Sequence, residues 1–302
     1  MTPTSTDGLL LVDKPAGISS HDVVLAARRA VREKRIGHGG TLDPFATGLL
    51  VLLVGRATRL LQYLHAEPKV YTASVAFGAE TDTEDLGGTV THEAPLPTRS
   101  TLEAAASTLV GTIAQLPPAY SAKRVDGQRA YALARAGKEV TLAPVEVTIH
   151  ALQLSEFEPS GDRVSRCRMH VTCGGGTYIR SLARDLARAA GSAAHLTALR
   201  RERAGDFTLA RSIPYEQLRE GPVTLAPTID ALAGYGVQPL DPDECAKLVR
   251  GIDVEARVAG DFAALVDPRG VTPAEQLLAF AQRRSSERGD RFQPRVVMRD
   301  VA

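Results

Sequence analysis

Hydrophobic positions along this chain repeat at two spacings, and each spacing predicts a different secondary-structure element. Residues 49–54 are six apolar residues in a row between two glycines, which is typical of a strand buried on both faces. Strict alternation over residues 70–77 and 163–173 predicts two half-buried strands, and residues 9–12 form a further short apolar strand. These stretches predict a largely buried sheet.

Helices are predicted where apolar residues recur every three or four positions. Residues 22–34 are predicted to form a helix. Ser19 and Asp22, at its start, resemble a capping box. Residues 178–190 form a second such stretch, which Thr177 can cap. The buried stripe of this second helix consists of Ile179, Leu182, Ala183 and Leu186. Shorter helices are predicted at residues 58–65, 101–110 and 244–250.

The sequence changes in character near residue 234. Residues 238–242 read QPLDP, which is typical of a linker. Residues 283–291, RRSSERGDR, are predicted to form a mobile loop. The remaining pieces are short and strand-like, which is typical of a small β domain: residues 257–258, 263–266, 277–281 and 294–298. We therefore predict two domains, residues 1–234 and residues 235–302.

Composition is that of a soluble globular protein, with 44% hydrophobic and 24% charged residues. No stretch approaches the roughly 18 consecutive apolar residues of a membrane span, so we expect no membrane association. The first residues lack the basic and apolar regions of a secretory signal, and the three cysteines are scattered. These features indicate a reducing compartment, and we expect a cytoplasmic protein. No cysteine or histidine spacing suits zinc, so no metal is expected.

One carboxylate stands out in the glycine-rich segment before the apolar strand. The segment reads RIGHGGTLDPFATG, and Asp43 is followed at once by Pro44. Because proline disfavours the α region for the residue before it, Asp43 is expected in a stiff loop at the rim of the sheet. A turn-forming role alone is the alternative. The segment is not a phosphate loop, because a strand follows it where a phosphate loop needs a helix.

Basic residues are unevenly distributed, although the net charge is only +1. One cluster lies at residues 28–35, and another at residues 200–211. Between them in the chain, Arg180, Arg184 and Arg188 recur every four residues, whereas acidic residues gather elsewhere, at residues 80–85. Arginine stripes are most often solvated helix faces. Three clusters near a candidate site nevertheless favour a phosphate backbone as the partner.

Several segments of the chain resemble the TruB-type tRNA pseudouridine synthases. GHGGTLDPFATGLL resembles the family signature GHTGTLDPxATGxL and departs from it at Gly39, where the family has threonine. Four further segments are similar to family motifs: LVDKPAGISS, KVYTASVAFG, YSAKRVDGQRAYALARAG and HLTALRRER. CGGGTYIRSLARDLA also resembles a family motif, but Gly174 and Gly175 stand where the family has Ser-Lys.

The resemblance implies a role for each matching residue. Asp43 would be the catalytic carboxylate, and Tyr71 would stack on the target base, although Tyr71 read alone is equally a core aromatic. Arg180 would orient Asp43 and hold it ionised. Lys14 would lie near the active site, although by itself it would more often be a surface lysine. The other residues implied at the pocket are Tyr178, Leu199 and His38.

The resemblance also implies RNA-binding elements. An insertion at about residues 115–145 would grip the RNA, with a short amphipathic helix at residues 130–136 as the structural alternative. Residues 235–302 would form a reduced PUA-type RNA-binding domain. The candidate RNA-binding residues are Lys123, Arg124, Arg129, Arg135, Arg200 and Arg201.

The implied fold is α/β (α+β), with a mixed, mainly antiparallel central sheet, flanking helices and a small β-barrel-like C-terminal domain. The implied reaction isomerises the T-loop uridine of tRNA, at position 55, to pseudouridine after the base is flipped out of its stack. The implied partner is the T stem-loop of tRNA, with no cofactor, and we expect a monomer. Whether Asp43 attacks the sugar or the base, or removes a sugar proton, stays open.

Other classes stay open at this stage. One is a non-catalytic RNA-binding protein of the same fold, which the presence of Asp43, Tyr71 and Arg180 disfavours. Another is a hydrolase with a pair of carboxylates, for which Asp185 is the candidate second carboxylate. A guide-RNA-dependent relative would be expected to carry longer extensions at both ends.

Overall fold

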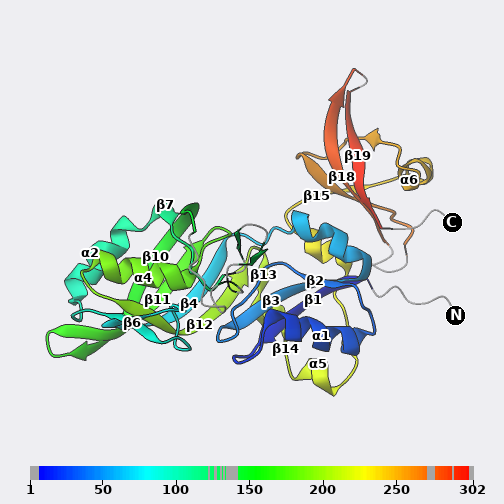
Figure 1. Cartoon of the computed structure of the whole chain (residues 1–302). Coiled ribbons are helices and arrows are strands. Elements are labelled where there is room, and N and C mark those ends of the chain that lie inside the picture. Colours follow the sequence, from blue (N-terminus) through cyan, green and yellow to red (C-terminus); the bar gives the residue numbers. More distant parts are fainter. Residues whose placement is uncertain are drawn as a thin grey trace. The chain divides into compact units, whose positions relative to one another are not determined.

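The computed structural model describes residues 7–121, 123–125, 128–129, 131, 133, 142–270, 276–287 and 289–298. The chain divides into two compact units (Figure 1). The first unit comprises Met1–Asp43, Leu49–Ala66 and Asp206–Ala302. The second unit comprises Pro44–Gly48 and Glu67–Gly205.

The second unit is built on five neighbouring strands. Their order is β12 (Ala194–Ala204), β4 (Lys69–Phe77), β11 (Arg163–Cys173), β10 (Val145–Ser160) and β7 (Gly111–Gln115), and each pairs antiparallel with the next. On its other edge, β12 pairs in parallel with the first residues of β3 (Thr47–Val54). The sheet is therefore mixed and mainly antiparallel, as predicted. Two short hairpins accompany it: β5 (Ala79–Thr81) with β6 (Val90–Glu93), and β8 (Arg124–Val125) with β9 (Gln128–Arg129).

Two helices of this unit are α2 (Arg99–Thr108) and α4 (Ile179–Ala189). Helix α4 packs against α2 and against strands β12 and β4. The predicted alternation of β4 is confirmed, because its buried side chains lie at every second position: Tyr71, Ala73, Val75 and Phe77. The predicted stripe of α4 is buried as well: Ile179, Leu182, Ala183 and Leu186. Strand β10, which the sequence analysis did not assign, follows the same alternation over its first residues.

The first unit contains the N-terminal strands and helix. Strand β1 (Gly8–Lys14) lies between β14 (Ile213–Pro214) and β3, and β2 (Ile36–His38) pairs antiparallel with β3. Helix α1 (Ser20–Val31) begins at the predicted capping box of Ser19 and Asp22. Its apolar side packs on β1 and β3 through a core of residues such as Leu10, Val12, Val23, Leu50 and Leu52. Smaller elements of this unit are β13 (Phe207–Thr208), α5 (Gln217–Glu220) and the 3₁₀ helices η1 (Gly55–Tyr63), η2 (Leu209–Arg211) and η3 (Thr228–Leu232).

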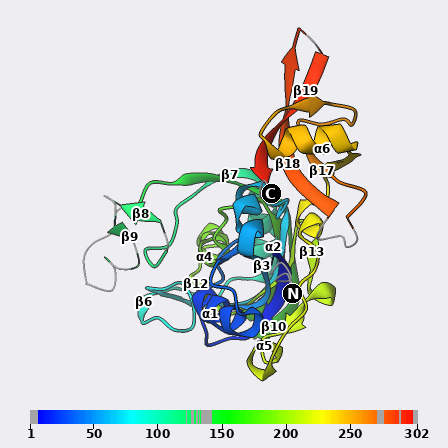
Figure 2. The same cartoon turned by 90° about the vertical axis from the view of Figure 1, so that its right-hand side faces the viewer.

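The C-terminal residues of the first unit form a curled five-stranded sheet (Figure 2). The strand order is β15 (Gly236–Pro239), β17 (Phe262–Val266), β18 (Leu277–Ser286), β19 (Gly289–Val297) and β16 (Val254–Glu255). Helix α6 (Pro242–Val249) packs against this sheet around Leu248, Leu265 and Phe292. This arrangement agrees with the small PUA-type β domain that was predicted.

Aromatic side chains pack between the C-terminal sheet and the preceding part of the same unit. Tyr63 of η1 lies 4.8 Å from Phe280 and 5.5 Å from Phe262, measured between ring centroids. Arg59 Nη1 also donates a hydrogen bond of 2.9 Å to the Val297 carbonyl. The division of the chain at residue 234 therefore stays a prediction, since side chains pack across it.

Two local predictions were wrong, and the bounds and type of a third element differ from the prediction. The predicted mobile loop at residues 283–291 belongs to the hairpin of β18 and β19, where Arg283 Nη1 bonds Asp290 at 2.7 Å. The helix predicted at residues 58–65 is the 3₁₀ helix η1, which begins at Gly55 and ends at Tyr63. Thr177 does not cap α4, because its hydroxyl donates to the Gly174 carbonyl at 2.9 Å.

Candidate active site

The chain leading into Asp43 is fixed by a buried serine. Ser20, at the start of α1, accepts a hydrogen bond of 2.8 Å from the Leu42 amide and donates one of 3.0 Å to the Leu42 carbonyl. Ser20 and Leu42 are both buried, whereas Asp43 is half-buried. The backbone directly before the carboxylate is therefore clamped by one side chain, which agrees with the stiff loop that Pro44 predicts.

The chain leading out of the loop is fixed against β12. Thr47 pairs with Arg200, and the Thr47 hydroxyl donates to the Leu199 carbonyl at 3.4 Å. Gly48 has φ of +102°, and a Cβ atom at this position would lie 2.2 Å from the Arg201 carbonyl oxygen. Only glycine allows this approach. Residues 44–48, which follow Asp43 directly, are thus held against the strand that carries Leu199.

Three candidate residues share one face of the sheet. In the register of β4 and β12, Tyr71 lies opposite Arg201, and Ala73 lies opposite Leu199. Tyr71, Leu199 and Arg201 are all buried. Burial lowers the pKa of the neighbouring Lys69, and the charge of Arg201 lowers it further. This face therefore combines a flat aromatic ring, an apolar side chain and fixed positive charge. The burial of Tyr71 suits a core aromatic as well as a pocket wall, so its stacking role stays a prediction.

Tyr178 lies at the N-terminus of α4, where its backbone is held by a fully buried glutamine. The Tyr178 amide donates to Gln115 Oε1 at 2.8 Å, and Gln115 Nε2 donates to the Tyr178 carbonyl at 3.1 Å. The preceding turn contains the departure from the family motif. A Cβ atom on Gly175 would lie 2.0 Å from Glu67 Oε1, so a lysine at this position would require the Glu67 side chain to move.

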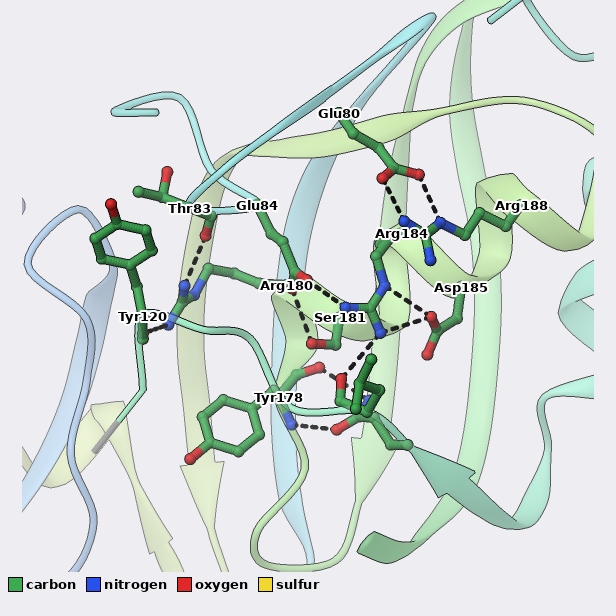
Figure 3. Close-up of polar contacts among 12 residues, drawn as sticks. Glu80, Thr83, Glu84, Tyr120, Tyr178, Arg180, Ser181, Arg184, Asp185 and Arg188 are labelled. Carbon is green, nitrogen blue, oxygen red and sulfur yellow. Dashed lines mark hydrogen bonds and ion pairs between the residues drawn. The ribbon is translucent and has the colours of Figure 1, made fainter. Parts of the chain in front are cut away.

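Arg180 is buried in the first turn of α4 and is 3% exposed. Its Nη1 donates to the Thr83 carbonyl at 2.6 Å, and its Nη2 donates to the Tyr120 carbonyl at 3.0 Å (Figure 3). Two backbone segments far apart in the sequence thus hold one guanidinium. Arg180 is not part of a solvated stripe, and its predicted action on Asp43 stays a prediction.

The other two arginines of the α4 stripe bind the acidic segment at residues 80–85. Arg184 forms a buried ion pair with Glu84 and contacts Asp185 at 2.8 Å. Arg188 binds Glu80 through two hydrogen bonds of 2.8 and 2.6 Å. Burial raises the pKa of Glu84 and of Asp185, while the hydrogen bonds to Glu80 raise the pKa of Arg188. Of these two arginines, only Arg188 is exposed enough to resemble a solvated helix face, the alternative to phosphate binding for this stripe.

Lys14 and His38 occupy the first unit. Lys14 is completely buried at the end of β1, and its Nζ donates to the carbonyls of Pro15 and Ile18, each at 2.8 Å. The interpretation of Lys14 as a surface lysine is therefore wrong. His38 is half-buried in β2, opposite Leu52 of β3. Contact of either residue with RNA stays a prediction.

The candidate RNA-binding residues differ in their surroundings. Lys123 is half-buried, and Arg124 pairs with Arg129 across the β8–β9 hairpin. Arg200 Nη1 donates to the Thr47 hydroxyl at 3.4 Å, whereas Arg201 is 2% exposed. Arg135 lies outside the described residues. Contact of these residues with RNA stays a prediction.

No group of three or more His, Cys, Asp and Glu side chains among the described residues is arranged to hold a metal ion. In the same part of the chain, no helix is long and apolar enough to cross a membrane.

Comparison with known protein families identifies the relatives of this chain. Residues 28–179 match the model of the TruB family pseudouridylate synthase N-terminal domain. The chain belongs to the TruB family. Its relatives are similar over nearly their whole length. The tRNA pseudouridine synthase B of Thermobifida fusca is 42% identical over 286 residues, which cover 92% of this chain and 95% of that protein. The tRNA pseudouridine synthase B of Rhodococcus jostii is 43% identical and covers 92% of both chains.

Solved structures extend the TruB comparison to the fold. An H/ACA ribonucleoprotein bound to a substrate RNA containing 2′-deoxyuridine contains a chain that matches with a TM-score of 0.69 and 20% identity. That match covers 97% of this TruB-family chain and 86% of the other. A chain of the Cbf5-Nop10-Gar1 complex matches with a TM-score of 0.66 and 23% identity. Both matches show that the fold is shared.

Proposed function

We propose that this protein is a tRNA pseudouridine synthase that isomerises the T-loop uridine at position 55. The observation that carries the proposal is the similarity of nearly the whole chain to synthases of that name, at 42% identity over 92% of its residues. The geometry around the matching residues supports it. Asp43 lies between two clamped segments, and the strand that anchors the second clamp also carries Leu199.

The reaction is an exchange of one glycosidic bond for another. The bond between the sugar and N1 of uracil breaks, the base rotates, and a bond from the sugar to C5 forms, while the proton on C5 passes to solvent and N1 takes one up. Asp43 supplies a carboxylate that acts as nucleophile or stabilises the charge that develops as the base detaches. No electrons are gained or lost, so the balance requires neither oxidant nor reductant.

The substrate base must leave its stack before a carboxylate reaches the sugar or the ring. Tyr71 offers a flat ring with a polar end on which a flipped base stacks, and Leu199 offers an apolar wall on the same face of the sheet. Tyr178 and Arg180 belong to the same unit, at the start of α4. Arg180 is held in one orientation by two carbonyls, so it presents a charge that does not have to reorganise during the reaction.

The alternatives are less well supported. A non-catalytic RNA-binding protein would not require Asp43 to be clamped on both sides. A hydrolase with two carboxylates would require Asp185 at the reacting bond, but Asp185 contacts Arg184 at 2.8 Å. We therefore propose tRNA as the partner. We also propose that the enzyme is monomeric and cytoplasmic.

The test is incubation of the full-length protein with unmodified tRNA transcript, followed by mapping of pseudouridine. Asp43→Asn keeps the size of the side chain but removes its charge, so we expect it to lose nearly all turnover while tRNA still binds. Asp162→Asn, at the exposed turn between β10 and β11, is the matched control and should retain wild-type turnover. Near-wild-type turnover of Asp43→Asn would contradict the assignment.

A further inference from the structure

Glu84 is a buried junction between the loop after β5, helix α4 and strand β12. Its amide donates to the Thr81 carbonyl at 3.0 Å, and its carbonyl accepts the Leu196 amide of β12 at 3.1 Å. Its carboxylate accepts the Ser181 hydroxyl at 2.8 Å and forms the ion pair with Arg184. Its φ of +60° lies in the left-handed region, which is strained for a residue with a side chain. Several hydrogen-bond partners and one ion pair therefore hold Glu84 in a single conformation.

This junction surrounds the residues that hold Arg180. The Thr83 carbonyl, directly before Glu84 in the chain, accepts Arg180 Nη1 at 2.6 Å. On α4, Glu84 is bound by Ser181, which directly follows Arg180, and by Arg184, which lies one helical turn beyond Arg180. Figure 3 shows the Glu84 carboxylate bonded to Ser181 and Arg184, and the Arg180 guanidinium between Thr83 and Tyr120. Glu84 thus binds the helix that carries Arg180, and it directly follows the residue whose carbonyl accepts Arg180.

We propose that the buried ion pair of Glu84 and Arg184 is a positioning device that fixes the Arg180 guanidinium for the isomerisation, an inference that rests on the proposed function. Glu84 acts through Arg180 and need not touch the substrate. Without its charge, the strained loop and the first turn of α4 lose their common anchor. The Thr83 carbonyl and the guanidinium then sample more than one arrangement, and the productive one is populated less.

Taking this ion pair into the protein interior has a desolvation cost. Burial raises the pKa of Glu84 in spite of the opposing effects of Arg184, Ser181 and Arg180. Ionised Glu84 is therefore less favourable here than in water, as is common when two charges are taken from water into a protein interior. A buried charge on a left-handed backbone, directly after the residue whose carbonyl accepts Arg180, fits a positioning role.

The molecule contains a matched control for this proposal. Glu80 and Arg188 form a second ion pair between the same β5 region and the same helix, with two hydrogen bonds of 2.8 and 2.6 Å. Arg188 lies two helical turns beyond Arg180, and its side chain is 57% exposed. Removing the Glu80 charge breaks a second glutamate–arginine pair, whose arginine is largely exposed, and should leave the Thr83 carbonyl in place. The two glutamates therefore separate positioning of Arg180 from general attachment of α4.

The experiment compares three full-length variants with the wild type: Glu84→Gln, Glu80→Gln and Ser181→Ala. The measurements are the single-turnover rate on unmodified tRNA, the affinity for that tRNA and the midpoint of thermal unfolding. We expect Glu84→Gln to lower the rate by about 10- to 100-fold, because small misplacements of a reacting constellation have effects of this size. Its affinity for tRNA should stay close to that of the wild type. Its unfolding midpoint should fall, because Arg184 keeps its contact with Asp185 but loses its buried charged partner, so the rate is measured at a temperature where the variant is fully folded.

The rates of the other two variants decide whether the effect of Glu84→Gln comes from positioning of Arg180. Ser181→Ala removes only one hydroxyl from the Glu84 carboxylate, so we expect a smaller loss of rate in a protein that folds normally, and Glu80→Gln should match the wild type. Equal rates for Glu84→Gln and Glu80→Gln would overturn the proposal, as would a loss of rate that follows the unfolded fraction. If Glu84→Gln does not fold, a wild-type rate for Ser181→Ala overturns it. An inactive wild type would overturn the proposed function itself.

Discussion

The arginines of helix α4 and those of the C-terminal sheet differ in where their charges are satisfied. Arg180 and Arg184 are nearly inaccessible, and they bond backbone carbonyls and a buried carboxylate of their own unit. Arg257, in the segment between strands β16 and β17 of the C-terminal sheet, binds Glu244 near the surface, while Arg295 of β19 is exposed and bonds the neutral amide of Gln282. One residue type thus occurs as an internal anchor and as a surface charge.

This difference indicates what each region is built to do. Burying a guanidinium costs free energy. Several fixed hydrogen-bond partners offset part of that cost, and they hold the guanidinium in one orientation. Exposed ion pairs contribute little to stability, and exposed arginines keep their charge available to an anionic partner. The α4 arginines therefore suit precise placement of charge, whereas those of the C-terminal sheet suit attraction of a phosphate backbone.

The largest expected effect is that of replacing Arg180. Arg180→Ala leaves the carbonyls of Thr83 and Tyr120 without this donor, and each buried unsatisfied group costs about 1–3 kcal/mol of the free energy of unfolding. We expect near-complete loss of pseudouridine formation together with measurable destabilisation. Arg180→Lys should recover little turnover, because lysine lacks the planar fork that reaches both carbonyls.

The measurements for Arg180 are turnover on unmodified tRNA and denaturant unfolding of the same preparations. Arg188→Lys is the matched control on the same helix, because its guanidinium is largely exposed. We expect this variant to keep its turnover. If Arg180→Lys were fully active, Arg180 would be an ordinary helix arginine, and the contrast between the two regions would lose its functional meaning.

The sequence predicted the elements of this fold better than it predicted their polar contacts. Periodicity located α1, β4 and β11 closely, because burial of one face leaves a period in the sequence. The Pro44 rule and the glycines predicted a fixed loop at Asp43. The Glu84–Arg184 pair was not predicted, since nothing local shows that a charged loop residue will meet a helix 100 residues later. The hairpin at residues 283–291 was missed because its polar composition resembles that of a loop.

A second effect concerns what stabilises the C-terminal sheet. Phe280 is completely buried, and its ring lies 4.8 Å from the centroids of both Tyr63 and Tyr235. Phe280→Ala should lower the free energy of unfolding by about 3–5 kcal/mol, since it leaves a cavity in this aromatic cluster. Denaturant unfolding measures the change. Phe262→Ala, at a half-buried position of the same cluster, should cost less. Equal stability of Phe280→Ala and the wild type would mean that the cluster does not join the sheet to η1.

The smallest expected effect is a difference between two exposed arginines of the C-terminal region, Arg295 and Arg257, in the salt dependence of tRNA binding. Arg295 bonds only a neutral amide among its described hydrogen-bond partners, so its charge remains available to a phosphate. Arg257 is already paired with Glu244 through two hydrogen bonds, and these raise its pKa. Arg295→Ala should therefore reduce the slope of log affinity for tRNA against log salt by about one unit.

Arg257→Ala is the control for this last prediction, because it removes a charge that Glu244 neutralises and should leave the salt slope nearly unchanged. Single-turnover rates at saturating tRNA should stay at the wild-type value in both variants, since neither residue belongs to the proposed active site. A salt titration of tRNA binding with the full-length proteins makes the measurement. If both variants changed the slope equally, local pairing would not decide which arginines meet the phosphate backbone. If only Arg257→Ala changed it, Glu244 would have to release Arg257 when RNA binds.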